Sequence, residues 1–196
     1  MGGERLARAR LTADGVEGDR AVLVRGPRGR IVTSRSRPAL LGLHAAGSPP
    51  LVNGLAWTEP EVARLVHEAA GPHAVLERAG EEPGRFDVLP LLVATDGALQ
   101  ATGTDWRRFR PNLVIGGVEG LAEREWEGRK LRVGKALIAV GDLRARCVMT
   151  TFDPDTQAQD PLVLRRIVEE FDGVLGLNCA VLEDGLVSEG DEVQLL

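Results

Sequence analysis

Glycine interrupts the apolar segments of this chain at short intervals, and that pattern limits the folds it can adopt. There are 24 glycines among the 196 residues, and the segments rich in Val, Leu and Ile between them are short. Many short strands joined by glycine turns are typical of barrels and sandwiches, whereas a doubly wound α/β sheet needs a helix between successive strands. We therefore expect an α+β protein that is mostly β, with a few peripheral helices.

The expected strands are runs of β-branched residues and leucine that are bounded by turn residues. They cover residues 6–12, 20–25, 30–33, 88–95, 112–116, 130–140, 178–183 and 192–196. A Gly-Pro-Arg-Gly loop at 26–29 joins the second and third of these strands, which predicts a hairpin. Asp184-Gly185 marks a further tight turn.

The first helix signal begins just after residue 57. Thr58 and Glu61 have the spacing of a capping box, and Pro60 suits a first helical turn. Apolar side chains then recur at the i, i+3, i+4 and i+7 positions, namely Val62, Leu65, Val66 and Ala69. We expect this helix to end at Gly71.

The second helix signal begins at Asp160, which Pro161 follows. The apolar side chains that share one helical face are Leu164, Ile167, Val168 and Phe171. Gly173 supplies the stop. The sequence therefore predicts one well-marked helix in each half of the chain.

An acidic stretch at 79–85, which contains proline and glycine, is the predicted boundary between a domain at 1–84 and a domain at 85–196. Charge is also unevenly distributed: the first 40 residues have a net charge of +5, whereas the whole chain has −5. A basic segment on an acidic protein favours a specific anion site over a nucleic-acid surface. Because 22 of the 24 basic residues are arginine, genome composition explains the same pattern equally well.

Composition excludes several classes of protein. With 43% hydrophobic and 27% charged residues, the chain resembles a globular protein rather than a disordered one. No apolar run reaches 18 residues, and three arginines occur in the first ten, so we expect no membrane span, no secretory signal and a cytoplasmic location. Two cysteines cannot supply the four thiolates of an iron–sulfur cluster, and we expect neither such a cluster nor a haem in this chain.

Cys147 is the strongest candidate for a reactive or metal-binding side chain. It follows Arg146, and an adjacent guanidinium favours a thiolate, which is both a nucleophile and a soft metal ligand. A lone cysteine is more often a small buried hydrophobe, so the residues alone leave both roles open. Cys179 lies in an apolar run and fits the buried role. His44, His67 and His73 lack ligand spacing, and we expect them to be structural.

The segment around Cys147 resembles a family signature. Residues 144–156, Arg-Ala-Arg-Cys-Val-Met-Thr-Thr-Phe-Asp-Pro-Asp-Thr, are similar to the signature of MOSC domains, the family of molybdenum cofactor sulfurase C-terminal domains and the amidoxime-reducing component. The Phe-Arg-Pro-Asn-Leu-Val-Ile segment at 109–115 resembles its second motif. Further segments match in the same order, at 15–20, 33–40, 125–128, 133–134 and 187–193. The resemblance implies a MOSC-type β-barrel after an N-terminal β-barrel-like domain.

The resemblance also implies a molybdenum cofactor site. The residues that it assigns to the cofactor are Arg20, Thr95, Arg110, Asn112, Arg146 and Cys147. Among them Cys147 is the molybdenum ligand and catalytic residue, while Arg20 and Arg146 contact the anionic end of the cofactor. The residues alone allow plainer roles: Arg110 precedes a proline, which predicts extended backbone and a surface ion pair, and Asn112 would satisfy a turn.

The reducing branch of the family implies an oxidoreductase that removes oxygen from N-hydroxylated compounds such as amidoximes, hydroxylamines and hydroxylaminopurines. Its electrons would come from a separate ferredoxin-like protein or flavoprotein, with no nucleic-acid or membrane partner. The alternative is a carrier of molybdenum cofactor or sulfur without turnover of its own. Ala145 and Phe152 depart from the family pattern and are expected to reshape the pocket. Family members usually begin with an extra strand that ends in a lysine–serine pair near the cofactor phosphate; this pair is absent from the sequence, which predicts fewer contacts to the phosphate.

Overall fold

The computed structural model of the protein describes residues 1–80 and 85–196. They form two compact units: unit 1 comprises Met1–Arg5, Gly18–Asp87 and Asp153–Ala158, and unit 2 comprises Leu6–Glu17, Val88–Phe152 and Gln159–Leu196. The sequence placed a domain boundary after residue 84, next to residues 81–84, which lie outside the described residues. That boundary stays a prediction.

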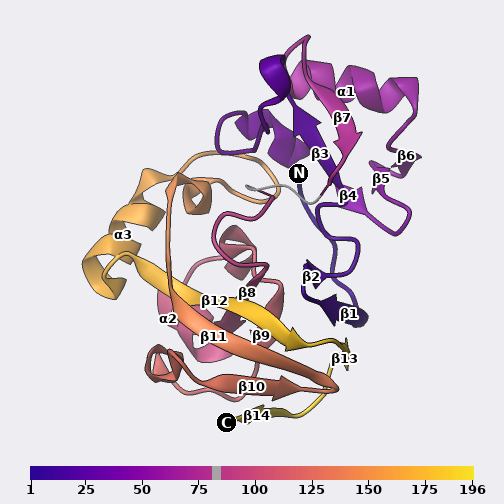
Figure 1. Ribbon diagram of the computed structural model, residues 1–196. Helices are drawn as coiled ribbons and strands as arrows, with labels where there is room; N and C mark the ends of the chain where they lie inside the picture. The colour runs from indigo at the N-terminus through magenta and orange to yellow at the C-terminus, as the bar shows by residue number, and fades with distance from the viewer. Residues whose placement is uncertain (81–84) are drawn as a thin grey trace. The chain divides into compact units, whose positions relative to one another are not determined.

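A curled, half-barrel sheet of six strands is the main feature of unit 2 (Figure 1). In spatial order its strands are β14 (Val193–Leu195), β10 (Lys130–Val133), β11 (Ala136–Ala145), β12 (Val174–Glu183), β8 (Leu91–Thr95) and β9 (Leu113–Ile115). All neighbours are antiparallel except β8 and β9, which run parallel. The predicted α+β, mostly β class is confirmed.

A second sheet of unit 2 joins the two ends of the chain. Its strands are, in order, β13 (Gly185–Ser188), β1 (Arg8–Thr12) and β2 (Gly15–Val16). Asp184 separates β12 from β13, so the predicted turn at 184–185 carries the chain from one sheet to the other. Leu11 and Val187 from this sheet pack into the apolar core of the half-barrel, which makes the two sheets of unit 2 share one core.

Three expected features of unit 2 differ in the structure. Residues 130–140 form two strands rather than one, because Gly134 has a φ of 51° and turns the chain between β10 and β11. A helix at α2 (Asp96–Thr102) was not predicted, since its seven residues are too few to show a period. In α3 (Pro161–Phe171), Ile167 and Phe171 are buried as expected, but Val168 is 56% exposed, so its assignment to the buried face was wrong.

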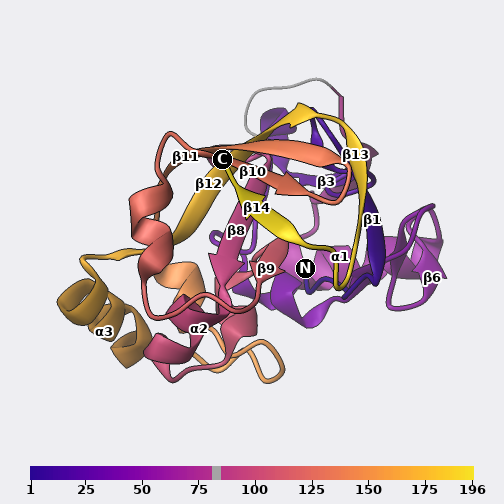
Figure 2. The same ribbon diagram turned by 90° about the horizontal axis from the view of Figure 1, so that it is seen from below.

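Asp160 begins α3 as expected, and its side chain accepts a hydrogen bond from the amide of Leu162. The face that α3 buries meets α2 and the short 3-10 helix η3 (Trp106–Phe109) around Phe109 and Ala98. Seen from below, α2 and α3 lie close together beside the sheet (Figure 2). These helices cover the end of the sheet at which β11 leads to Cys147.

The described part of unit 1 contains two small sheets, one α-helix and two short 3-10 helices, η1 (Pro27–Gly29) and η2 (Pro38–Gly42). β3 (Val22–Arg25) pairs antiparallel with β7 (Val75–Arg78), and β4 (Ala45–Ala46), β5 (Leu51–Val52) and β6 (Leu55–Ala56) form a meander. The helix is α1 (Pro60–Ala70), whose buried side chains Val62 and Val66 face an apolar cluster.

Two local expectations in unit 1 were wrong. The N-cap of α1 is Glu59, one residue after the expected Thr58, and it makes no side-chain capping bond; Glu61 pairs with Arg64. Residues 30–33 form no strand: Ile31 makes a single bridge to Arg25, and the partner of β3 is β7. The expected end at Gly71 is confirmed.

None of the helices in the described part of the chain has the length and apolar character that crossing a bilayer requires.

The glycine turn that follows β9 is held by one carboxylate. Asp96 accepts hydrogen bonds from the amides of Gly117 (2.8 Å) and Val118 (3.0 Å). These bonds keep the pKa of Asp96 below its usual range, and the bond from Gly117 has the largest effect. A carboxylate whose pKa is lowered on folding stabilises the folded protein at pH values above the pKa that this group has in the unfolded chain. The stabilisation is lost as the pH falls through the pKa of the group in the folded protein.

We therefore expect Asp96→Asn to lower the unfolding temperature at pH 7, because an amide nitrogen cannot accept the second bond. The difference from the wild type should shrink as the pH is lowered below about 4, where the carboxyl of the unfolded chain is protonated. Thermal unfolding of both proteins across this pH range is the measurement. A difference that is independent of pH would show that the carboxylate charge has no part in holding the turn.

Candidate functional site

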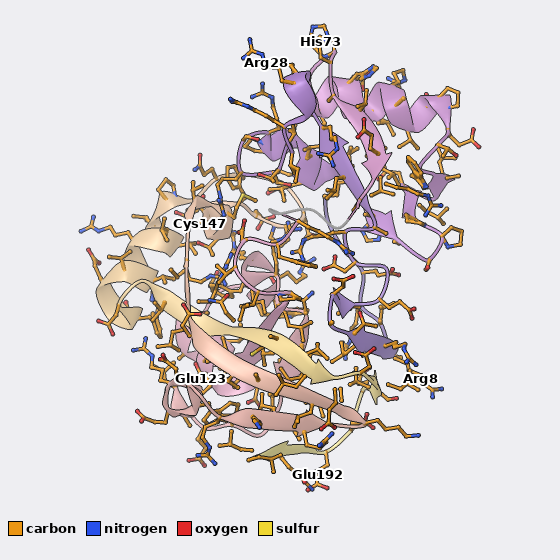
Figure 3. The ribbon with its side chains drawn as sticks, in the orientation of Figure 1. Arg8, Arg28, His73, Glu123, Cys147 and Glu192 are labelled. Atoms are coloured by element: carbon orange, nitrogen blue, oxygen red, sulfur yellow. The ribbon has the colours of Figure 1, made fainter. Side chains whose placement is uncertain are left out.

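Cys147 lies directly after the long strand β11, at the start of the 3-10 helix η5 (Val148–Thr151). The amide of Arg146 donates to the carbonyl of Gly173 (2.8 Å), which holds the chain at the end of the sheet. The carbonyl of Cys147 accepts from the amide and the hydroxyl of Thr150, at 3.1 and 2.9 Å. The backbone of Cys147 is thus anchored on both sides, while the residue itself is half-buried (Figure 3).

Two arginines tie η5 to η3 beside this cysteine. Arg146 donates from Nη2 to the carbonyl of Phe109 (2.7 Å), and its guanidinium carbon lies 5.4 Å from the centre of the Phe109 ring. Arg108 donates from Nη1 to the carbonyl of Thr151 (3.0 Å). The structure therefore brings the two sequence motifs, 109–115 and 144–156, together through Phe109. Guanidinium groups so placed suit an anionic ligand, since they stay charged and donate several hydrogen bonds.

A polar chain centred on the buried Asn178 supports the same end of β11. Arg144 Nη1 lies 3.3 Å from Asn178 Oδ1, and Asn178 Nδ2 donates to Asp142 (3.0 Å). Asn178 is only 3% exposed, in the middle of β12. Sequence reasoning missed Arg108, Arg144 and Asn178. The signal was the polar asparagine within an otherwise apolar strand, because a buried amide needs partners.

Asn112 and Thr95 both have scaffold roles. The side-chain oxygen of Asn112 accepts from the amide of Leu92 (2.9 Å), which extends the pairing of β8 and β9. The hydroxyl of Thr95 donates to Glu123 (3.1 Å) and accepts from the amide of Ala98 (3.2 Å), and Thr95 is fully buried. Glu123 lies well apart from Cys147 in Figure 3, so the structure does not bring Thr95 to the cysteine. Their contacts with a cofactor stay predictions.

Arg20 belongs to unit 1, where a second arginine accompanies it. The guanidinium carbons of Arg20 and Arg85 lie 5.2 and 5.1 Å from the centre of the Phe86 ring. Arg20 donates to the carboxylate of Asp19, and Arg85 donates to the backbone carbonyl of Asp19, both at 2.8 Å. Unit 1 thus carries a basic cluster at the position that the resemblance assigned to an anion.

Cys179 has the buried role that the sequence indicated. It is fully buried in the core of the half-barrel, and its Sγ lies 3.8 Å from the carbonyl of Leu177. Burial raises the pKa of Cys179 to about 12, so this thiol stays protonated at neutral pH. Neither cysteine forms a disulfide bond. The accessible thiol chemistry of the described residues therefore belongs to Cys147.

The backbone of Arg110 differs from expectation. The following proline predicted extended backbone, but Arg110 has φ 55° and ψ 48°, in the left-handed region. Its amide donates to the carbonyl of Arg107 (3.2 Å), and this bond ends η3. This conformation costs a non-glycine residue about 1 kcal/mol of free energy. Such outliers occur where a side chain is needed at a particular place.

We expect Arg110→Gly to keep or raise the unfolding temperature, because glycine adopts this backbone without strain. If the side chain contacts an anionic cofactor, the same change should weaken cofactor binding about tenfold, the effect of one lost charge-assisted hydrogen bond. Thermal unfolding and the cofactor content of the purified protein measure the two effects. Arg107→Ala, which removes an exposed arginine paired with Asp105, is the matched control. Unchanged cofactor content in Arg110→Gly would remove Arg110 from the site.

Comparison with known proteins gives the family. The MOSC domain model matches residues 92–194, more than half of the chain. Human mitochondrial amidoxime reducing component 2 is 34% identical over 80 residues, which are 38% of this chain and 23% of that protein. Human mitochondrial amidoxime-reducing component 1 is 26% identical over 159 residues, 68% of this chain and 47% of that protein. The chain therefore spans less than half the length of these relatives.

The fold comparison agrees. The crystal structure of the YuaD protein from Bacillus subtilis is similar with a TM-score of 0.52 at 15% identity, over 98% of this chain and 86% of that one. This likeness covers the fold alone. The matched region 92–194 contains Cys147, Arg146 and the Phe109 segment that Arg146 holds. The chain belongs to the MOSC domain family.

Proposed function

We propose that the protein binds molybdenum cofactor through Cys147 and reduces N-hydroxylated compounds. The observation that carries the proposal is the half-buried thiol of Cys147, anchored at the end of β11 with the guanidinium of Arg146 beside it in the chain. The MOSC family is associated with this cofactor, and the distant relatives are amidoxime-reducing components. Because the chain covers less than half of those relatives, their activity comes to it only as a proposal.

The donor set fits such a group. A thiolate is a ligand that suits a soft, redox-active metal, and the pKa of Cys179 leaves Cys147 as the thiol able to act. Arg146 and Arg108 are fixed by backbone carbonyls at 2.7 and 3.0 Å, so their orientations do not depend on a ligand. Guanidiniums fixed in this way match the phosphate and the oxygens of a pterin cofactor.

The proposal gives the chain's own residues the following roles. Cys147 would hold the metal, and Arg146 and Arg110 would neutralise the anionic part of the cofactor. Arg144 and Asp142 link the end of β11 to Asn178 of β12, over a stretch where the register of the two strands is irregular. When bound, the molybdenum cofactor supplies the two-electron chemistry of oxygen removal. Overall, an N–OH group, two electrons and two protons give N–H and water, with the electrons from a separate donor protein.

The test is to produce the chain in a host that makes molybdenum cofactor and to measure molybdenum and pterin per protein. Near-stoichiometric amounts of both are expected. Benzamidoxime is then supplied with a reduced viologen dye, and benzamidine formation is followed. Turnover supports the reductase, whereas stoichiometric cofactor without turnover on any N-hydroxylated compound would favour the carrier. Protein that contains neither metal nor pterin would contradict both.

A further inference from the structure

A cavity of about 580 Å³ lies in unit 2 between the two edge strands of the half-barrel. The six-stranded sheet begins with β14 and ends with β9, and residues of both strands line the cavity. Figure 2 shows the ribbons of these strands near each other on the open side of the sheet. The volume falls in the range of small-molecule sites in proteins, which is about 300–1,000 Å³.

The walls of this edge cavity combine apolar side chains with polar backbone and carboxylates. Val114 from β9 and Leu195 from β14 are 46% and 37% exposed, so apolar surface is open to a ligand there. Trp126 adds an indole that also packs against the core of the half-barrel. Gly116 and Gly117 leave backbone without side chains along one wall. An apolar or aromatic group would bury surface in this space and gain binding energy from it.

The charged residues of the lining are both acidic. They are Asp191 and Glu192, and no lysine, arginine or histidine lines the cavity. Asp191 has a structural task, because its Oδ2 accepts from the amide of Ser188 (2.8 Å) and holds the turn before β14. Glu192 is exposed, with Gln194 Nε2 at 3.5 Å from its Oε1. Its carboxylate is therefore available at the mouth, where a cation would meet it.

We infer that the edge cavity binds small organic cations that carry an aromatic or apolar body. The body would lie against Trp126 and the apolar walls, and the cationic group would meet Glu192. Indole rings attract cations in addition to their apolar contact, which favours a charged ligand over its neutral analogue. An anion of the same size is excluded by the two carboxylates.

This site is distinct from the candidate cofactor site. Glu192 and Cys147 lie far apart within unit 2 in Figure 3. None of the residues that line the edge cavity is a cofactor candidate, although Asn112 directly precedes β9, which lines the cavity. The inference therefore stands or fails independently of the proposed reductase.

The test compares three probes of similar size on the full chain: benzylamine, which is a cation at pH 7, benzyl alcohol and benzoate. Affinities come from calorimetry, and the location comes from NMR of the indole N–H groups. The chain has three tryptophans, and Trp57→Phe and Trp106→Phe assign the remaining signal to Trp126. We expect benzylamine to bind saturably and shift the Trp126 signal, benzyl alcohol to bind more weakly, and benzoate not to bind.

Glu192→Gln should raise the Kd of benzylamine about fivefold, the effect of one exposed ion pair at the upper end of its range, and leave that of benzyl alcohol unchanged. Asp184→Asn, an equal change of charge at an exposed turn outside the cavity, should change neither. Equal affinity for the amine and the alcohol would overturn the inference. So would binding of benzylamine that leaves the Trp126 signal in place, or no saturable binding.

Discussion

Cys147→Ser purified from a host that makes molybdenum cofactor should contain less than about a tenth of the molybdenum of the wild type, and its dye-driven reduction of benzamidoxime should be undetectable. A serine hydroxyl is a harder and far less acidic ligand than a thiol, so it does not replace a thiolate on a soft metal. The fold should persist, because Cys147 is half-buried and serine keeps the backbone carbonyl that accepts the bonds from Thr150. Molybdenum analysis, activity and thermal unfolding separate these effects.

Cys179→Ser is the matched control. It places a hydroxyl in the core of the half-barrel, where burial of a polar group costs about 1–3 kcal/mol. The unfolding temperature should fall, but molybdenum per folded protein and activity per molybdenum should stay at the wild-type level. Wild-type metal content in Cys147→Ser, or loss of metal in Cys179→Ser alone, would refute the assignment of Cys147 as the ligand.

Gly185→Ala should destabilise unit 2 strongly, because the added methyl group has no space. A Cβ at residue 185 would lie 2.3 Å from the amide nitrogen of Ala136 and 2.4 Å from the carbonyl carbon of Lys135. Both atoms are backbone of the turn between β10 and β11, so no rotamer change relieves the clash. Gly185 also pairs with Leu11, which is fully buried, so a shift of β13 would disturb the core.

We expect Gly185→Ala to lower the free energy of unfolding by about 3 kcal/mol or more. In a protein of this size the unfolding temperature should fall by at least about 6 °C. Gly116→Ala is the matched control, because the atom nearest to its Cβ is a carboxylate oxygen of Asp96 at 3.8 Å and its φ is not positive. Equal unfolding temperatures for the two variants in denaturation experiments would contradict the close approach of the strands.

Much of the fold was predictable, because short apolar runs bounded by glycine turns are the local pattern of β-strands. The strands at 91–95, 113–115 and 193–195 and the helices at 60–70 and 161–171 lie where the sequence indicated. Pairing was not predictable: β3 meets β7 across some fifty residues, although a loop at 26–29 favoured a local hairpin. Long-range pairs depend on burial in the assembled core, which local patterns do not encode.

The candidate site was predicted in part. The residue types around Cys147 pointed to metal and anion chemistry, but the link from Arg146 to the carbonyl of Phe109 depends on folding. The left-handed backbone of Arg110 was not foreseen, because a residue before proline is normally extended. Thr95 caps α2 and donates to Glu123, a role that the resemblance did not indicate, and its contact with a cofactor stays a prediction.

The order in which the ribosome makes the chain bears on the second sheet of unit 2. β1 is made well before its partner β13, with which it pairs from Arg8 opposite Ser188 to Leu11 opposite Gly185. During synthesis β1 has to remain unpaired with β13 while more than 170 residues follow it, and it carries an edge open to wrong partners for that time. Arg8 and Arg10 put positive charge on β1 while it is unpaired and so reduce its tendency to aggregate.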